Sequence, residues 1–361
     1  MSKRKTFVAG VLGVVGVAWT AVPAEAATSG TVSKVSGNVV VYTAAPGKAN
    51  NVRLSRTGST LTVDDIYGLK AGPGCAAVKG DVTRITCAGA VWIRADLGDG
   101  NDTLVNNSGL GMTAWGRGGN DKITGGPARD DVYGGDGNDA IWGLGGNDVL
   151  RGEAGNDALS GGDGNDTIAD GTGNDRLLGG NGDDVFINQQ GNDVFDGGAG
   201  NDSFNTPTDY PAGTDRDSFT GGPGTDVVDY QSRKKPVTAD ADGVAGDDGS
   251  AGEGDSISST VEGLGGGDAA DRLLGTTRDE GFFGGPGNDV IAGSTGDDLL
   301  WGEDGNDYLN GAGGYDACVD AAAGDTVLNC EESGSAVTTL TSARPTGATR
   351  MELLIKLRTS S

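Results

Sequence analysis

The feature that most constrains this chain is a nine-residue repeat marked by an aspartate. Between residues 116 and 205 an aspartate recurs every nine residues, ten times in succession, from Asp121 to Asp202. An apolar residue follows each aspartate at a distance of two, from Ile123 to Phe204. A unit this short cannot form a core around a single apolar side chain. The copies therefore have to stack, so that their apolar residues make one continuous ladder.

The rest of the repeat predicts a flattened coil. Glycine accounts for 69 of the 361 residues and hydrophobic residues for only 35%, so we do not expect a thick conventional core. Six residues of each copy, rich in glycine and asparagine, suit a tight turn, and three suit a short strand. Two copies then make one coil with parallel sheets on two faces. A disordered linker is the alternative, but linkers do not keep an apolar residue in phase over ten periods.

Charge indicates what the coil binds. The formal net charge is −26, which opposes compaction unless cations neutralise it and which disfavours nucleic acid and anionic membranes as partners. The chain has no histidine, so His-ligated zinc and Ser–His or Cys–His catalysis are excluded. Stacked coils bring like carboxylates close together, and these cannot all stay ionised without a cation between them. Carboxylate and carbonyl oxygens suit Ca²⁺ better than Mg²⁺.

The repeat resembles a known motif. Residues 134–142, GGDGNDAIW, and 161–169, GGDGNDTIA, match G-G-x-G-x-D-x-U-x, the calcium-binding nonapeptide of RTX or haemolysin-type proteins, in full. The resemblance implies an all-β fold, a parallel β-roll (a β-solenoid), with several Ca²⁺ ions between successive turns on the same side. The aspartates of the repeats are then the predicted metal ligands: Asp102, Asp121, Asp130, Asp139, Asp148, Asp157, Asp166, Asp175, Asp184, Asp193, Asp202, Asp226, Asp271, Asp289, Asp298, Asp307, Asp316 and Asp325.

Two copies depart from the motif, and we expect weak sites there. In the first, Ala128 and Arg129 replace the inner glycine and the asparagine before Asp130. In the second, Glu280 stands in the aspartate position and Arg278 lies in the turn.

The segments outside the repeats divide the chain further. Residues 1–26 read as a secretory signal peptide, with a basic start, a short apolar run and an Ala-Glu-Ala cleavage site, so we expect an extracellular protein. Residues 27–96 form a small β-rich cap, or less simply a ligand-binding domain, with strands expected at Asn38–Thr43 and Leu61–Val63. The alternation of Val91, Ile93, Ala95 and Leu97 with polar residues predicts a last strand that leads into the repeats.

The first array covers 97–229, with its strict part at 116–205, and the second covers 266–330. Residues 230–265, acidic and rich in glycine, interrupt them as a solvated excursion or an extra ion site. Residues 331–361 form a tail that is a capping strand or helix or a frayed end. No stretch after the signal peptide is long and apolar enough to span a membrane.

The four cysteines predict two local disulfides, because an exported chain favours pairing of closely spaced cysteines. Cys75 pairs with Cys87, and Cys318 with Cys330, which closes the last turn as an end cap.

The function we predict is a secreted calcium-ion-binding protein, with a structural or binding role, that folds on meeting external calcium. We expect no enzyme. The alternatives are an extracellular adhesin or matrix component, whose cell-surface partner the sequence does not name, and a secreted hydrolase that carries an RTX module. The segments outside the repeats are short, and neither an HExxH nor a G-x-S-x-G motif is present, which disfavours the hydrolase.

Overall fold

The computed structural model describes residues 30–333 except 46, 210–214 and 320–323. The predicted signal peptide and most of the predicted tail lie outside the described residues. No helix of the described part is long and apolar enough to cross a membrane.

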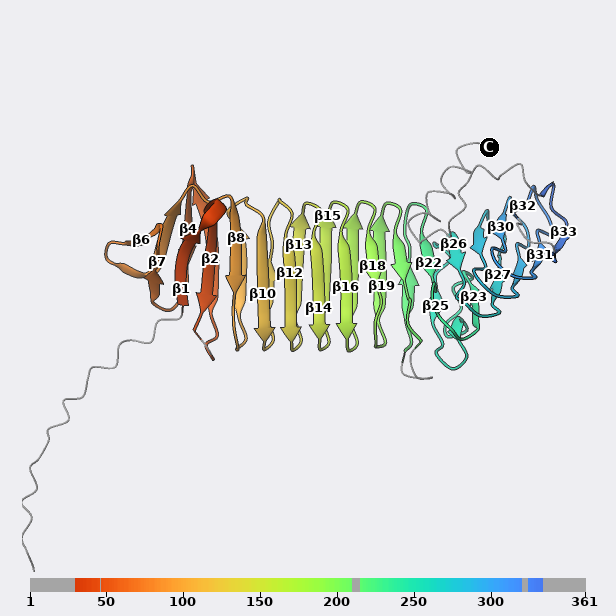
Figure 1. Ribbon diagram of the computed structural model, residues 1–361, viewed down its shortest axis with the longest axis horizontal. Helices are drawn as coiled ribbons and strands as arrows, with labels where there is room; N and C mark the ends of the chain where they lie inside the picture. The colour runs from red at the N-terminus through yellow and green to blue at the C-terminus, as the bar shows by residue number, and fades with distance from the viewer. Residues whose placement is uncertain (1–29, 46, 210–214, 320–323, 334–361) are drawn as a thin grey trace, which may run out of the picture.

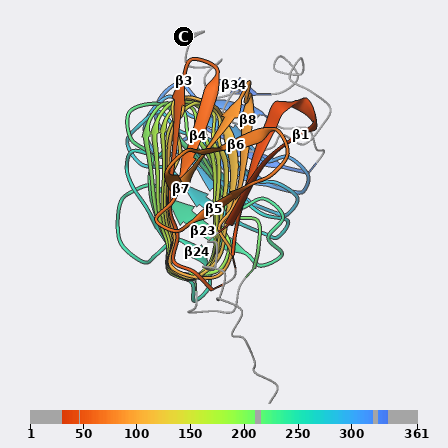
Figure 2. The ribbon, with the colours of Figure 1, turned by 90° about the vertical axis from the view of Figure 1, so that its left-hand side faces the viewer.

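The molecule is an elongated rod of stacked β-strands (Figure 1). Seen from its N-terminal end, the coils superimpose into a narrow, flattened ring (Figure 2). The described residues contain no α-helix and only one short 3-10 turn, η1 (Ser36–Asn38). The predicted fold, an all-β parallel roll, is confirmed.

Sheet A has 16 strands and runs the whole length of the rod. From the N-terminal end it consists of β5 (Leu69–Ala71), β1 (Gly30–Val35), β2 (Val39–Ala44), β8 (Trp92–Asp96), β10 (Met112–Gly118), β12 (Asp131–Asp136), β14 (Val149–Ala154), β16 (Thr167–Thr172), β18 (Val185–Ile187), β20 (Ser203–Asn205), β22 (Val227–Asp229), β26 (Gly263–Gly265), β28 (Gly281–Phe283), β30 (Leu299–Trp301), β32 (Ala317–Val319) and β34 (Glu332–Ser333).

The other side of the coil is divided between two sheets. Sheet B has 12 strands: β6 (Cys75–Val78), β7 (Asp81–Ala88), β4 (Thr60–Asp64), β3 (Asn51–Thr57), β9 (Thr103–Asn107), β11 (Lys122–Thr124), β13 (Ala140–Gly145), β15 (Ala158–Asp163), β17 (Arg176–Asn181), β19 (Val194–Ala199), β21 (Ser218–Thr220) and β25 (Ser256–Ile257). Sheet C has six: β24 (Gly249–Ser250), β23 (Val237–Asp240), β27 (Arg272–Leu274), β29 (Val290–Ala292), β31 (Tyr308–Asn310) and β33 (Thr326–Leu328).

The core is the apolar ladder that the period predicts. Ile123 of β11 pairs in parallel with Ile141 of β13, which pairs with Leu159 of β15, so that each coil takes two nine-residue copies. The apolar residues two places after the aspartates are 0–1% exposed from Ile123 to Phe204. Towards the end of the first array the ladder becomes aromatic, where the Phe195 and Phe219 rings stack with centroids 5.1 Å apart.

The N-terminal segment covers the open end of the roll with antiparallel strands. β1 pairs with β2, and β3, β4, β7 and β6 pair antiparallel in that order, with the Cys75–Cys87 disulfide joining β6 to β7. β2 and β3 also pair in parallel with β8 and β9, so the cap continues the register of the coils. In β8 Ile93 and Ala95 are fully buried as expected, as is Leu97 after it, whereas Val91 lies before the strand and is 56% exposed.

Between the arrays the chain changes sheets. Val227 of β22 pairs with Gly263 of β26, so one coil spans 36 residues where regular coils span 18. The additional residues form the hairpin of β23 and β24, which starts sheet C, and β25, which ends sheet B. At the far end, Cys318 and Cys330 are joined as predicted.

Candidate metal centres

The aspartates of the repeats form three rows, one beside each sheet. In every row the backbone N–H of one aspartate donates to the Oδ1 atom of the aspartate one coil further on; Asp121 N to Asp139 Oδ1, at 2.7 Å, is typical. Each aspartate directly precedes a strand, so we name the rows after the sheets. Row B consists of Asp102, Asp121, Asp139, Asp157, Asp175, Asp193, Asp217 and Asp255.

Row A follows the longest sheet and contains glutamates as well as aspartates: Asp130, Asp148, Asp166, Asp184, Asp202, Asp226, Glu262, Glu280, Asp298, Asp316 and Glu331. Row C consists of Asp271, Asp289, Asp307 and Asp325. All 18 predicted ligands therefore lie in the rows.

The second carboxylate oxygen, Oδ2, is what makes the rows candidate metal centres. In thirteen of the predicted ligands this atom is buried and has no hydrogen-bond partner among the described residues: Asp102, Asp121, Asp139, Asp148, Asp157, Asp166, Asp175, Asp184, Asp193, Asp202, Asp289, Asp298 and Asp316. Their side chains are at most 4% exposed. A buried polar atom without a partner is costly, and a regular series of such atoms indicates a common ligand.

A carbonyl oxygen lies near the carboxylate oxygen in the copies whose first residue is glycine. A Cβ atom added to Gly134 would lie 2.7 Å from the carbonyl oxygen of Gly152 and closer still to Asp139 Oδ2. Both oxygens thus converge on the first glycine of the motif, one from its own turn and one from the next coil. Carboxylate plus carbonyl oxygen is the ligand set that Ca²⁺ prefers, so the residues present fit that ion.

Burial raises the pKa of these carboxyl groups, and neighbouring row members add to the shift. The pKa rises from 3.8 to about 7 for Asp148, Asp157 and Asp193, and to about 8 for Asp184. For Asp184 the negative charges of Asp202 and Asp166 raise it further, whereas the N–H of Asp166 lowers it. The carboxyl groups of the rows are therefore more stable with a bound proton or cation than when they are ionised without one.

In three row members the second oxygen accepts a backbone N–H from the same turn. Asp130 Oδ2 accepts the N–H of Gly126 at 2.7 Å, and Asp271 Oδ2 accepts the N–H of Gly267 at 2.6 Å. The Glu280 carboxylate accepts the N–H of Thr276 in the same way. In these turns the second residue of the motif points its N–H at the carboxylate.

Several row members do not follow the nine-residue period. Asp217, Asp255, Glu262 and Glu331 accept the same backbone N–H contact as the regular aspartates but lie 15 to 38 residues from the preceding member. The cap supplies one more: the Asn50 N–H donates to Asp102 Oδ1 at 2.5 Å. The sequence signal that could have identified these two aspartates and two glutamates is an acidic residue directly before a short strand.

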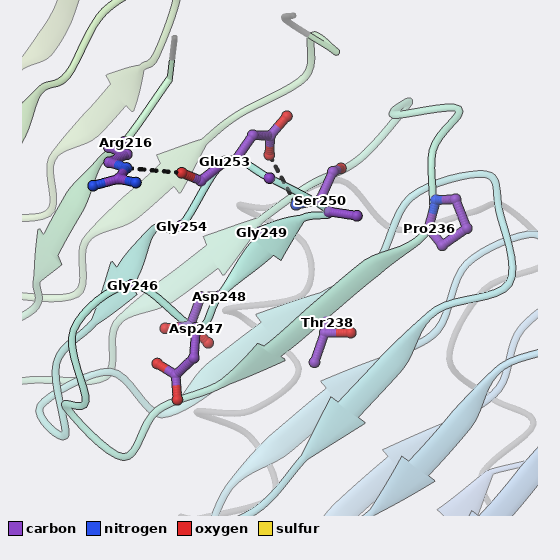
Figure 3. Close-up of a pocket in the computed structure, with 12 residues that line it drawn as sticks. Arg216, Pro236, Thr238, Gly246, Asp247, Asp248, Gly249, Ser250, Glu253 and Gly254 are labelled. Atoms are coloured by element: carbon purple, nitrogen blue, oxygen red, sulfur yellow. Dashed lines mark hydrogen bonds between the residues drawn. The ribbon is translucent and has the colours of Figure 1, made fainter. Parts of the chain in front are cut away.

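The interruption between the arrays carries a further group of carboxylates. Carboxylate oxygens of Asp240, Asp242 and Asp247 lie within 4.8 Å of one another, and two of these side chains are exposed. A pocket of about 430 Å³ lies alongside, where Asp247 and Glu253 line it and Arg216 donates to the Glu253 carbonyl oxygen (Figure 3). Exposed acidic clusters are common without an ion, so the extra ion site expected there stays a prediction.

Comparison with known families supports the interpretation of the rows. The RTX calcium-binding nonapeptide repeat family, whose model spans four copies, matches residues 113–141, 133–168, 160–195, 170–204 and 283–317. No curated protein matches the chain. Repeats of this family are calcium binders, and the matched segments contain buried aspartates of rows A, B and C. The chain therefore contains RTX calcium-binding nonapeptide repeats over residues 113–204 and 283–317.

Proposed function

We propose that this chain is a secreted structural protein whose roll assembles when calcium binds outside the cell. The observation that carries the proposal is the series of buried Oδ2 atoms without a hydrogen-bond partner along rows A and B. These atoms recur at every coil of the first array, which is a pattern of ion positions and not of an isolated site.

The residues that would hold the ions are the row aspartates and the facing carbonyl groups. In the first array these are row B from Asp102 to Asp193 and row A from Asp148 to Asp202. Parallel strands are about 4.8 Å apart, so successive carboxylates of a row face one another at close range. Bound calcium supplies positive charge between them, which lets the carboxylates stay ionised while buried.

Calcium binding and folding are coupled in this arrangement. The core is a single ladder of apolar side chains, and the open rows add repulsion, so the free energy of ion binding becomes free energy of folding. Calcium is scarce in the cytosol and abundant outside, so the chain is exported unfolded and stiffens outside. Two disulfides and the predicted signal peptide support the extracellular location.

The protein acts through its shape and not through catalysis. The chain lacks histidine, and its largest feature is an uninterrupted rod (Figure 1). A rod of stacked coils suits a spacer or a matrix element, which is the role we assign within the structural class.

Far-ultraviolet circular dichroism of the mature chain, residues 27–361, tests the proposal. Titration with Ca²⁺ after removal of metal by EDTA should produce most of the β signal, and isothermal titration calorimetry should show several ions bound. Mg²⁺ at the same concentration serves as the control, because it fits these large oxygen sites poorly. A β signal already complete in EDTA, and unchanged by calcium, would refute the proposal.

A further inference from the structure

Arg278 lies in the turn that precedes Glu280 of row A, at the position that the inner glycine occupies in the regular copies. Its guanidinium group contacts the carboxylates of Glu262 and Glu280, with Nη1 3.5 Å from Glu262 Oε1 and Nη2 2.9 Å from Glu280 Oε1. Nη2 also lies 3.0 Å from the carbonyl oxygen of Val261 and 3.3 Å from that of Ala241. One cation is thus surrounded by two carboxylates and two carbonyl oxygens.

Glu262 and Glu280 are consecutive members of row A. The N–H of Asp226 donates to Glu262 Oε2 at 3.0 Å, as each regular aspartate does to the next. The Glu262 carbonyl oxygen accepts the N–H of Gly281, and the Glu280 carbonyl oxygen accepts the N–H of Leu299, both at 2.9 Å. The carbonyl oxygens of regular aspartates likewise accept the N–H of the residue 19 positions later, as the Asp130 carbonyl oxygen accepts the N–H of Val149 at 2.9 Å.

The guanidinium group therefore places positive charge between two successive carboxylates of row A, although its side chain is 31% exposed and the carbonyl oxygens that it contacts are not those of a first glycine. It is always positive, and its N–H groups satisfy carboxylate and carbonyl oxygens directly. Both acidic residues beside the guanidinium group are glutamates, whereas row A otherwise consists mainly of aspartates. The additional methylene group of a glutamate leaves space for a cation that belongs to a side chain. We propose that Arg278 is a built-in replacement for a calcium ion, so that the coil joining the two arrays folds without metal.

In row B, other protein groups donate hydrogen bonds to the carboxylates of the same region. Asp217 Oδ2 accepts the Asn188 side-chain N–H at 2.6 Å, and Asp255 Oδ2 accepts the Tyr230 hydroxyl at 3.1 Å. Arg233 is 1% exposed, and it ion-pairs with Glu253 at the end of the row. Residues 215–280, which we name the junction, thus carry internal donors in both rows.

The consequence is a folding order. A solenoid can nucleate at any coil and grow by addition of neighbours. This inference rests on the proposed function, in which the two arrays fold only when calcium binds. The junction, in contrast, is ordered without calcium. It offers β22 and β28 as templates for row A coils on either side.

Hydrogen exchange of the full mature chain, followed by mass spectrometry in EDTA, tests the folding order. Peptides from residues 256–283 should exchange at least tenfold more slowly than peptides from residues 121–202, and calcium should remove this difference. Equal, fast exchange of both segments in EDTA, with protection of both in calcium, overturns the inference and leaves the proposed function intact. Slow exchange of both segments in EDTA overturns the proposed function as well.

The variant Arg278→Met tests the guanidinium itself. Without the guanidinium group the negative charges of Glu262 and Glu280 are no longer neutralised, so protection of 256–283 in EDTA should be lost, and calcium should restore it with one additional ion bound. Arg272→Met is the matched control, because Arg272 is an exposed arginine of the neighbouring strand β27 and should leave protection unchanged. Arg278→Lys should keep part of the protection, since the positive charge remains.

Two results would overturn this assignment. One is a variant Arg278→Met that exchanges like Arg272→Met in EDTA. The other is a variant Arg278→Met that stays unprotected in saturating calcium while Arg278→Lys behaves likewise, because the arginine would then be required for packing and not as a cation.

Discussion

Acidification should fold the metal-free roll. In the folded chain burial holds the pKa of Asp148, Asp157 and Asp193 at about 7 and that of Asp184 at about 8, against an ordinary value of 3.8. Asp102 has a pKa of about 7 for the same reason. The folded state therefore binds protons that the unfolded state releases. The stability that these carboxyl groups contribute is therefore fully present below pH 3.8, their unfolded pKa, and is lost as the pH rises through the folded pKa values.

The magnitude follows from the shifts. Between pH 5 and pH 7 these five carboxyl groups are ionised in the unfolded chain, whereas in the folded chain they release their protons only as the pH approaches 7 to 8, so each group loses about 2–3 kcal/mol of stability. Together the five groups lose on the order of 10 kcal/mol over this interval, which is comparable with the whole stability of an ordinary domain, about 5–15 kcal/mol. Without metal, the first array should be folded at pH 5 and unfolded at pH 7.5.

Circular dichroism of the metal-free mature chain, measured from pH 5 to pH 8, checks this expectation. The β signal of the array should fall as the pH rises, with a midpoint between pH 5 and pH 7, and saturating Ca²⁺ at pH 7.5 should restore it. Constant β signal across the range in EDTA would contradict the reasoning, because the buried carboxylates would then carry their charge without cost. The signal of the cap, which antiparallel pairing and a disulfide stabilise, is expected to persist throughout.

Three substitutions probe the row, the turn and the core in turn. Asp166→Asn should lower the number of bound calcium ions by at least one in calorimetry and yet raise the midpoint of the metal-free pH transition, because it removes one buried charge. Gly134→Ala should cost about 1–3 kcal/mol in urea unfolding with calcium, because the added methyl group meets the Asp139 carboxylate, whereas Gly118→Ala should be tolerated, because its Cβ would meet only Asp99 Oδ1, at 3.9 Å. Phe195→Ala should cost about 3–5 kcal/mol in the same assay, because its ring is fully buried in the aromatic part of the ladder.

The sequence predicted the fold and the regular part of the rows because both are periodic. An aspartate every nine residues and an apolar residue two places later leave few arrangements other than a stacked coil, and Ile123 to Phe204 occupy the core as expected. Asp255 and Glu262 escaped prediction because the coil that contains them is twice the usual length, which takes them out of phase.

Whether the second carboxylate oxygen of a row member accepts a hydrogen bond from its own turn also depends on the local backbone conformation, which the motif does not reveal. Gly125 and Gly126 match the first two positions of the nonapeptide, yet the N–H of Gly126 points at Asp130, whereas the corresponding Gly135 has a φ of +116°. A following proline does not mark the difference, because Gly222 and Gly285 also precede prolines and have φ values of +121° and +94°. Asn50 shows the same limit, because nothing in a cap without repeats indicates that one asparagine continues row B.

Sheet A crosses the junction as an unbroken ladder, whereas sheets B and C are joined there by the bridge between Asp248 and Asp255 and a few backbone hydrogen bonds beside it, such as that from Gly243 N–H to the Ile257 carbonyl oxygen. The rod is therefore continuous along one side and jointed along the other. Tension applied along its axis is transmitted through the hydrogen bonds of sheet A, and bending is easiest in the plane that opens or closes the joint between sheets B and C. A tether built in this way resists stretching while it flexes in one preferred direction.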